Sequence, residues 1–454
     1  MGAMEGQQKR NPIVMHTLAK SFPPLNGYTV RSHELLLAQN NSDRVTSFAL
    51  TSPYYSGIYE SDDDVNIDGV EYLRTPIHRS VKGKAESKLR TNGIEKTRIR
   101  GILGTIYSPI RLFLSLYRES VLMKKYQRRI ELVIRERDPC IVHAHTPFKV
   151  GIPSMKAARK FGKPFVYEAR GVWEESAIAR GNFSRWSPRY WRFRLMEKRT
   201  MKNADLVYCI SKELRAELIS RGVDRNKIFV IKNGAPSRYL EDLESAEYTG
   251  ENNSEIEIFE ELGKRGGIIG YTGSIQRYEG LELLSGAIKN VVENGVDLSL
   301  LIISNEEDVT RLRRYCEDLG MGDYTHIIGP VPRSEIRKYF ELMDVFVVPR
   351  LNESKMSELV TPMKQMEPLA LGIPLLISDI PAIRGIIGND TATFFEPGNM
   401  EDLSEKISML ISGDGRIKMK AENGIEWIRN EGTWDISAEK SIDLYRHLID
   451  LGNK

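Results

Sequence analysis

The order of short apolar segments along this chain limits its fold more than any other feature of the sequence. In the first half, Pro, Gly or Asp residues bound these segments, and helical stretches such as Gly151 to Lys160 and Lys212 to Arg221 separate them. The segments are 140–145, 165–167, 206–210 and 228–231. Strands that are apolar along most of their length and alternate with helices indicate a parallel sheet covered on both faces.

The start of the chain and its second half show the same order. Pro12 to Leu18 is expected to form a strand, Ser21 to Gly27 a loop and Thr29 to Gln39 a helix. The alternation begins again after Asn233 and Gly234. The strands expected there are 267–271, 298–303, 326–328, 345–348 and 375–377, and the helices are 281–293 and 334–342.

Residues 237–264, between the two halves, are acidic and polar, so we place the domain boundary near residue 236. We predict an α/β fold of two Rossmann-like doubly wound domains, 11–235 and 236–430, that face a central cleft. The helical spacing of apolar residues within 431–454 predicts a C-terminal helix that crosses back to the first domain. Ligands of such sheets bind beyond the carboxyl ends of the strands.

The formal net charge of +3 conceals two halves of opposite sign. Residues 1–235 hold 42 basic and 23 acidic residues, a net charge of +19, whereas residues 236–454 hold 23 basic and 39 acidic residues, a net charge of −16. With 41% hydrophobic and 28% charged residues, the composition excludes mainly disordered, collagen-like and multi-span membrane chains. Three cysteines without metal-ligand spacing favour a reducing, cytoplasmic compartment.

The segment 78–137 departs from the regular alternation. Between Arg79 and Arg137 there are 16 basic and 5 acidic residues, and apolar side chains from Ile110 to Met123 lie among them. A basic helix with aromatic residues can lie on an anionic membrane surface. An ordinary buried helix with solvated Lys and Arg residues explains the composition equally well.

The phosphate-binding fingerprints of dehydrogenases and P-loop NTPases are missing, because the chain has neither a G-x-G-x-x-G turn after its first strand nor a G-x-x-x-x-G-K-[ST] loop. Two glycine loops that follow strands and precede helices remain, Pro23 to Tyr28 and Thr272 to Gly280. Backbone amides in such loops can approach an anion closely. In the second loop Arg277 can meet a diphosphate with two parallel hydrogen bonds, unless it is simply a solvated surface residue.

A third candidate region follows the strand that ends at Val348. Pro362 suits the first turn of a helix with Thr361 as its cap, and Gly372 is expected to end that helix. Its amino-terminal amides would favour a sugar phosphate, and Glu367 could bind the two hydroxyls of a ribose. A solvated glutamate on a helix face is the ordinary alternative.

Together these segments resemble the donor half of retaining glycosyltransferases of family 4, which have the GT-B fold. Segments of the first half follow in the family's order, and the resemblance spans roughly residues 11 to 451. The matching donor-half segments are 271–274, 278–281, 358–362 and 366–367; those of the first half are 138–145, 167–174, 204–211 and 231–234.

The resemblance implies a site for a nucleotide-diphosphate sugar on the second domain and an acceptor site on the first. Glu367 resembles the acidic residue that binds the donor ribose, and Arg277 the basic residue on the diphosphate. The implied donor-side residues are Gly27, Gly273, Ser274, Arg277, Arg350, Val360, Thr361, Lys364 and Glu367. The implied acceptor-side residues are Asn26, Tyr28, His145, Glu168 and Arg170.

Three departures from the family pattern affect these implied roles. The usual Gly-Gly of the first loop is Asn26-Gly27, and the lysine common before the glycine of the second loop is Glu279, so one positive charge is absent there unless Lys364 supplies it. The first acidic residue of the usual pair falls at Leu359, although the adjacent Glu358 could serve if the loop shifts by one residue.

The third departure is Arg170, which stands where the family has a histidine. A guanidinium cannot act as a base at neutral pH, but it can hold a phosphate or an acidic acceptor. The resemblance therefore makes Arg277, Arg170 and Glu358 the candidate catalytic residues, with no metal and no cofactor.

The expected activity is retaining transfer of a sugar, from a UDP-sugar before other donors, to a glycan or lipid-linked acceptor in cell-surface polysaccharide synthesis. A catalytically silent nucleotide-sugar-binding subunit and a sugar-nucleotide epimerase of the same fold are the alternatives. We expect no nucleic-acid partner, and we expect a cytoplasmic protein whose basic half can contact the inner face of the cell membrane.

Overall fold

A computed structural model describes residues 11–55, 63–76, 103–241, 266–304, 306–413 and 415–452. The chain divides into two compact units. The first unit contains residues up to Ala169 together with 195–208 and 441–454, and the second contains 170–194 and 209–440. The predicted boundary near residue 236 remains a prediction.

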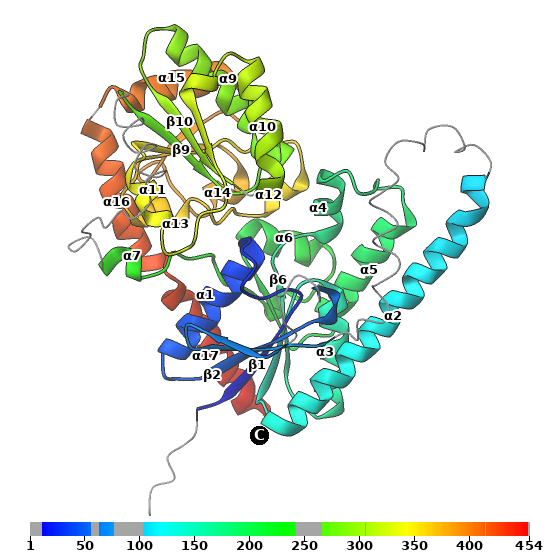
Figure 1. Ribbon diagram of the computed structural model, residues 1–454. Coiled ribbons are helices and arrows are strands. Elements are labelled where there is room, and N and C mark those ends of the chain that lie inside the picture. Colours follow the sequence, from blue (N-terminus) through cyan, green and yellow to red (C-terminus); the bar gives the residue numbers. More distant parts are fainter. Residues whose placement is uncertain are drawn as a thin grey trace, which may run out of the picture. The chain divides into compact units, whose positions relative to one another are not determined.

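An eight-stranded sheet in the order β3-β4-β2-β1-β5-β6-β7-β8 carries the first fold. Neighbouring strands from β4 to β6 run parallel, whereas the edge strand β3 runs antiparallel to β4. Figure 1 shows strands β1, β2 and β6 of this sheet. The strands are β1 Ile13–Leu18, β2 Thr46–Thr51, β3 Val65–Ile67, β4 Val70–Leu73, β5 Ile141–His145, β6 Phe165–Ala169, β7 Leu206–Cys209 and β8 Ile228–Val230.

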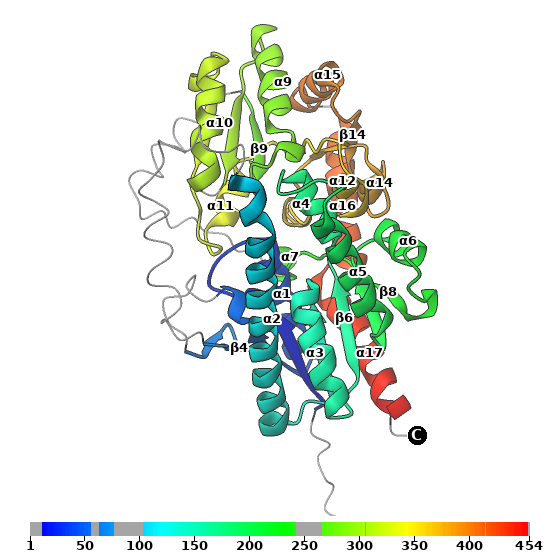
Figure 2. The ribbon, with the colours of Figure 1, turned by 90° about the vertical axis from the view of Figure 1, so that its right-hand side faces the viewer.

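Helices cover both faces of this sheet. Successive side chains of a strand point to opposite faces, so neighbouring residues of one strand contact helices on different sides. On β1, His16 bonds Gln39 of helix α1 (Gly27–Asn41), whereas Thr17 bonds Ser154 of helix α3 (Phe148–Lys160). Helix α2 (Leu103–Arg137) packs along α3, as Figure 2 shows. The other helices formed by this part of the sequence are α4 Trp173–Ala179, α5 Pro188–Lys202, α6 Lys212–Ser220 and α7 Arg238–Glu241.

The C-terminal helix α17 (Trp434–Gly452) begins in the second unit, and from Ser441 onward it belongs to the first. Its Tyr445 is fully buried, with its hydroxyl 2.6 Å from Nδ1 of His143 on β5. This confirms the predicted return of the C-terminal helix to the first fold.

The second fold is a six-stranded, fully parallel sheet in the order β11-β10-β9-β12-β13-β14. The strands are β9 Ile268–Thr272, β10 Ser299–Ile303, β11 Thr325–Ile328, β12 Val345–Val348, β13 Leu375–Ser378 and β14 Thr393–Phe395. The strand order reverses direction between β9 and β12, which is the point where ligands of such sheets bind. Two doubly wound α/β folds are therefore confirmed.

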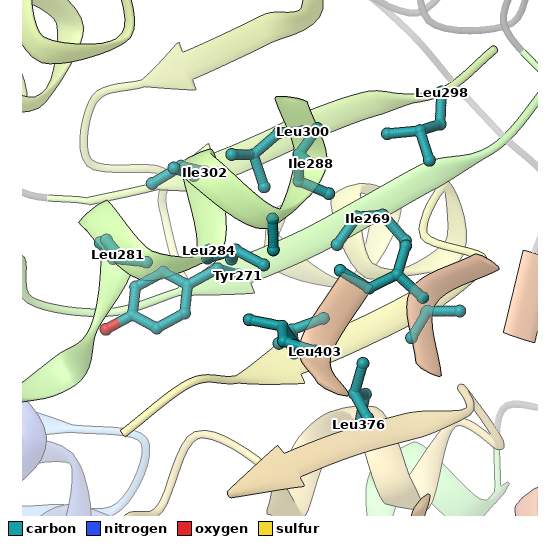
Figure 3. Close-up of a cluster of buried hydrophobic side chains, with 14 of the residues drawn as sticks. Ile269, Tyr271, Leu281, Leu284, Ile288, Leu298, Leu300, Ile302, Leu376 and Leu403 are labelled. Atoms are coloured by element: carbon teal, nitrogen blue, oxygen red, sulfur yellow. The ribbon is translucent and has the colours of Figure 1, made fainter. Parts of the chain in front are cut away.

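Alternate residues of the strands in the second sheet pack into two separate hydrophobic cores, one on each face, as expected for a sheet buried on both faces. Figure 3 shows one core, where Ile269, Leu300 and Leu376 from three strands pack with Leu284 and Leu403 from helices. The other core takes the intervening strand residues. The helices are α9 Leu281–Glu293, α10 Glu306–Asp318, α11 Ile336–Glu341, α12 Lys355–Leu359, α13 Met366–Ala370, α14 Pro381–Arg384, α15 Met400–Ile411 and α16 Gly415–Glu431.

The basic segment 78–137 forms helix α2 from Leu103 onward, while residues 78–102 lie outside the described chain. Tyr126, Ile130 and Val133 on its inner side are fully buried. No helix in the described ranges is long and apolar enough to cross a bilayer.

Candidate functional site

Several of the donor-side candidates lie where β9 and β12 end, at the point where the strand order of the second sheet reverses, whereas Gly27 begins helix α1 of the first fold. The glycine loop 273–280 follows β9, and Pro349 and Arg350 follow β12. Three charged side chains from these loops and from the segment before α13 meet there in a buried group, which we call the Glu279 cluster: Glu279, Arg350 and Lys364.

Glu279 lies at the centre of the Glu279 cluster. One carboxylate oxygen accepts a hydrogen bond from Nη2 of Arg350 at 2.8 Å, and the other accepts from Nζ of Lys364 at 2.8 Å. Arg350 also donates to the carbonyl of Val360 at 2.8 Å. The side chains of Glu279, Arg350 and Lys364 are only 4%, 6% and 12% exposed. One carboxylate therefore joins three segments that are distant in the sequence.

The electrostatics of the cluster shift two pKa values strongly. Burial alone would raise the pKa of the Glu279 carboxyl, but the charges and hydrogen bonds of Arg350 and Lys364 lower it to about 2. Burial lowers the pKa of Lys364 to about 8, an effect that Glu279 opposes and Arg350 reinforces. The carboxylate stays ionised at neutral pH, while the ammonium lies near its titration point.

The side chain of Lys364 also lies beside the first residue of the glycine loop, Gly273. A Cβ atom at Gly273 would lie 3.3 Å from its Cε and Nζ atoms, and Gly273 has a φ of +127°, a conformation that favours glycine. Nζ also donates to the hydroxyl of Tyr271 at 2.5 Å. The ring of Tyr271 belongs to the apolar core, and its oxygen points away from that core in Figure 3. Lys364 therefore lies beside the glycine loop, and its role as the substitute for the positive charge missing from position 279 remains a prediction.

The two loops touch through their backbones. Gly280 has a φ of +75°, and a Cβ there would collide with the carbonyl of Pro349. The amide of Leu351 donates to the carbonyl of Tyr278 at 2.8 Å. Glycine at 280 is therefore required both by its backbone conformation and by this close approach.

Arg277 does not join the Glu279 cluster. Its side chain is 81% exposed, and its Nε lies 3.8 Å from a carboxylate oxygen of Glu353. The neighbouring Ser274 supplies its backbone carbonyl to the hydroxyl of Tyr271 at 2.8 Å. The role predicted for Arg277 remains a prediction, and the structure places Lys364 rather than Arg277 beside Gly273.

The helix predicted from Thr361 to Gly372 is shorter than expected. Helix α13 begins at Met366, because the hydroxyl of Thr361 donates to the carbonyl of Ala382 at 3.0 Å instead of capping a helix. Gly372 has a φ of +71° just after the helix, as expected for a helix end. The predicted start of this helix at Thr361 is therefore wrong, and a phosphate-binding role of this segment remains a prediction.

The two acidic candidates of this region lie in different surroundings. Glu358 lies in α12 and is exposed. Glu367 lies in the first turn of α13 and accepts a hydrogen bond from Arg333 at 3.0 Å, with 20% of its side chain exposed. Gln365, just before α13, is fully buried, and neither polar atom of its amide has a hydrogen-bond partner in the described chain.

On the first fold, the acceptor-side candidates follow β1. The side chain of Asn26 accepts hydrogen bonds from the amides of Tyr28 and Thr29 and caps helix α1, which begins at Gly27. The hydroxyl of Tyr28 accepts from the amide of Ala19 at 2.9 Å. Asn26 thus replaces the first glycine of the usual pair with a side chain that begins the helix.

His145 and Glu168 lie side by side at the carboxyl ends of β5 and β6. Nδ1 of His145 lies 2.8 Å from Oε2 of Glu168, and Nε of Arg31 donates to Oε1 of Glu168 at 2.7 Å. All three side chains are buried. Arg31 was missed from the sequence, because a helix residue that pairs with a strand 137 positions away leaves no local signal.

Three buried histidines of the first fold, His16, His143 and His145, could together hold a metal ion. However, Nδ1 of His16 and Nε2 of His145 lie 2.8 Å apart and share a hydrogen bond. Their other ring nitrogens contact Gln39 and Glu168. Because both nitrogens of these two rings are engaged, the arrangement fits a proton-sharing network rather than a metal centre.

Arg170 follows β6 directly and is partly buried. The next residue, Gly171, has a φ of +158°, and a Cβ there would lie 3.1 Å from Cγ2 of Val360. Arg170 therefore lies one residue from a glycine that packs closely on the donor-side segment of the second unit.

The sequence matches known protein families over most of its length. Residues 253–427 match the family described as "Glycosyl transferases group 1", and residues 86–237 match "Glycosyltransferase Family 4". The chain belongs to the GT-B glycosyltransferases of this type. Among curated relatives, the capsular polysaccharide biosynthesis glycosyltransferase CapM of Staphylococcus aureus is 24% identical over 321 residues, which are 70% of this chain and 79% of CapM.

Solved glycosyltransferases share the fold of this chain. Sucrose-phosphate synthase from Thermosynechococcus elongatus has a TM-score of 0.70 at 15% identity, covering 97% of this chain and all of that one. Anabaena HepE in complex with UDP and glucose has a TM-score of 0.64 at 12% identity, covering 96% and 99%. These likenesses confirm the predicted GT-B fold.

Proposed function

We propose that this glycosyltransferase moves a sugar, with retention of anomeric configuration, from a UDP-sugar to a glycan or lipid-linked acceptor of a cell-surface polysaccharide. The relative CapM is named for capsular polysaccharide biosynthesis, and the HepE structure contains UDP and glucose. Both names support these substrate classes.

The observation that carries this proposal is the position of Lys364. Its ammonium lies beside Gly273, where the backbone of the loop after β9 offers close approach to an anion. The departing nucleoside diphosphate gains negative charge as the glycosidic bond breaks. A preorganised cation at that point stabilises the transition state more than the ground state.

In the proposed reaction the acceptor hydroxyl attacks the anomeric carbon from the face that the diphosphate leaves. The bond from the anomeric carbon to the phosphate oxygen breaks, and that oxygen takes the proton of the acceptor. The protein positions both substrates and neutralises the leaving group. Because Lys364 and Arg277 can supply positive charge, we propose that no resident metal is required.

A nucleotide panel tests the donor proposal. UDP, GDP and their sugars are added to the intact protein, and the thermal midpoint is measured. UDP should raise the midpoint most, since a ligand at 100 times its Kd stabilises by about 2.7 kcal/mol. A preference for GDP would overturn the choice of base, and no shift with any nucleotide would overturn the donor site.

The second candidate function is a catalytically silent subunit that binds nucleotide sugars. It is favoured by the substitution of Glu279 for the usual lysine and by Leu359 at the first acidic position. Slow donor hydrolysis that Glu367→Ala abolishes would support the transferase, whereas donor binding without hydrolysis or transfer would support the silent subunit. Release of an epimerised sugar would instead support the epimerase.

We also propose that helix α2 brings the enzyme to the inner face of the cell membrane. Leu114, Tyr117 and Val121 follow one another at helical spacing and are 47%, 61% and 46% exposed. The exposed Lys124 and Arg128 continue the same side of the helix. Apolar and basic side chains on one exposed side suit an anionic lipid surface.

A further inference from the structure

Helix α5 and the loop before it expose a second group of apolar side chains: Trp186, Trp191 and Leu195, which we call the tryptophan patch. Trp186 is 92% exposed, and Trp191 and Leu195 are each 58% exposed. Among the large apolar side chains of the described ranges, none is more exposed than Trp186. Such exposure contributes little to the stability of the fold and marks a surface for interaction.

The tryptophan patch has a defined geometry. Trp191 and Leu195 are four residues apart in α5, so they lie on the same side of the helix. The opposite side is anchored, because Tyr190 donates to Glu175 at 2.7 Å and Glu197 accepts from the amide of Phe148 at 2.7 Å. The helix is therefore held from within while its outer side stays exposed.

The charge around the tryptophan patch is strongly positive. Residues 180–202 contain eight basic residues and one acidic residue, the buried Glu197. Arg189, Arg199 and Lys202 are among the exposed residues of α5. Tryptophan concentrates at the headgroup level of membranes, and basic side chains near it are attracted to anionic lipids. This combination fits a lipid surface better than a protein partner, whose contact would bury a larger apolar area.

We propose that the tryptophan patch docks the enzyme on an anionic lipid surface, with both indole rings at the headgroup level. This deepens the proposed membrane location and rests on it, but it does not depend on sugar transfer. It adds to helix α2 a second contact whose apolar anchors are aromatic.

The quenching of tryptophan fluorescence by brominated lipids tests this contact directly. The full chain is mixed at low salt with vesicles of phosphatidylcholine alone or enriched in phosphatidylglycerol, each with brominated acyl chains. The chain has five tryptophans, and the three outside the patch are Trp173, Trp427 and Trp434. Phosphatidylglycerol vesicles should quench the wild-type emission, and Trp186→Ser/Trp191→Ser should abolish that quenching even where α2 still holds the protein on the vesicle.

Flotation measures the contribution of the patch to affinity. Trp186→Ser/Trp191→Ser should weaken vesicle partitioning by about tenfold or more. Leu195→Ser should weaken it measurably. Leu451→Ser is the matched control, because Leu451 is 54% exposed against 58% for Leu195 but lies in the C-terminal helix α17. The control should partition like the wild type.

Flotation of the wild type without quenching, or equal quenching of the wild type and the double variant, would overturn the proposal. Binding to an acidic protein but not to phosphatidylglycerol vesicles would also overturn it. UDP binding is measured on the same variants without vesicles and should be unchanged, which shows that they are folded. If UDP fails to bind but quenching persists, the donor proposal fails and the docking surface stands.

Discussion

Glu279 is the residue on which the donor-side loops depend. Its carboxylate stands where the family resemblance implies a lysine, and it holds Lys364 beside Gly273 and Arg350 against the carbonyl of Val360. We expect the cation of Lys364 to compensate for this difference in charge. The sequence suggested Lys364 as the substitute, but only the structure shows that Glu279 positions it.

Replacing Lys364 by methionine removes the buried cation while keeping an unbranched side chain that is one atom shorter. UDP should bind about 10- to 100-fold more weakly, the usual effect of losing one charged hydrogen bond. Titration calorimetry measures this, with Arg277→Ala in parallel. If Arg277→Ala removes UDP binding and Lys364→Met does not, the exposed arginine is the diphosphate ligand and the buried lysine is structural.

Replacing Glu279 by glutamine leaves Arg350 and Lys364 buried without a countercharge. We expect the second unit to lose about 3–5 kcal/mol of stability, as when one partner of a buried ion pair is removed. Glu282→Gln is the control, because Glu282 is 51% exposed in its pair with Arg311. Urea denaturation followed by hydrogen exchange of β9 should show a large loss for the first variant only. Equal midpoints would contradict a structural role for Glu279.

The pH dependence of donor binding follows from the pKa of Lys364. The lysine must be protonated to attract a diphosphate, and burial lowers its pKa to about 8. UDP affinity should therefore fall as the pH rises through about 8, well below the range of an exposed lysine. Lys364→Arg keeps its charge throughout, so any UDP affinity that this variant retains should be constant there. A wild-type affinity that stays constant up to pH 10 would exclude Lys364 as the ligand.

The stability of the wild type should also depend on pH at the acidic end. The pKa of Glu279 is about 2 in the folded protein against an ordinary value of 4.5. Its contribution is therefore complete above pH 4.5 and is lost as the pH falls toward 2. This acid-sensitive component should be missing from Glu279→Gln.

At the level of helices and strands, the spacing of apolar residues predicted the elements that pack into the hydrophobic cores. Strand β12 and helix α9 have the expected bounds. The strand is buried along its whole length and shows a continuous apolar run, and the helix is buried on one side and shows apolar residues at helical spacing. Strands β2, β3, β4 and β14 were missed. Polar residues interrupt or border the apolar residues of β2, β3 and β4, and β14 has only three residues, so none of them shows a continuous apolar run. The start of α13 was misplaced because Thr361 followed by Pro362 resembles the start of a helix. In the structure the Thr361 hydroxyl bonds the carbonyl of Ala382 and does not cap a helix.

The C-terminal helix α17 offers a test of how one element supports another. Tyr445→Phe removes the hydroxyl that bonds His143 and Gln39 in the buried network of the first fold. We expect a loss of about 1–3 kcal/mol, because buried polar groups lose their partner. Hydrogen exchange of β1 and β5 amides measures this locally. Leu451→Ala on the same helix should change it by no more than about 0.5 kcal/mol, and an equal effect of both variants would refute the role of the hydroxyl.

At the scale of the whole molecule, charge is distributed unevenly between the two halves of the sequence, at +19 and −16. The sequence alone revealed this asymmetry, whereas it could not show which basic residues are exposed. The structure places exposed apolar side chains among the basic residues of α2 and α5, and both helices lie in the positive half. The positive half is therefore the one that we expect to meet anionic lipids.

Removing three positive charges from α2 tests this expectation. Lys124→Ser/Lys125→Ser/Arg128→Ser should lower partitioning into phosphatidylglycerol vesicles roughly 100-fold at low salt, since each basic residue contributes about 1 kcal/mol. The difference should shrink as salt is added. The control removes three lysines of the second unit, namely Lys289, Lys406 and Lys418. A similar loss in the control would show that net charge alone matters, not the helix.

The contact between Gly280 and Pro349 has a mechanical consequence. Because the loop after β9 and the loop after β12 touch backbone to backbone and share the bond from Leu351 to Tyr278, neither can shift without dragging the other. We therefore expect a ligand that displaces the backbone at Gly273 to displace Arg350 as well. Arg350 would pass this movement to Val360, because it donates a hydrogen bond to the Val360 carbonyl. If the donor binds here as proposed, contacts with its two ends would act on the same pair of loops.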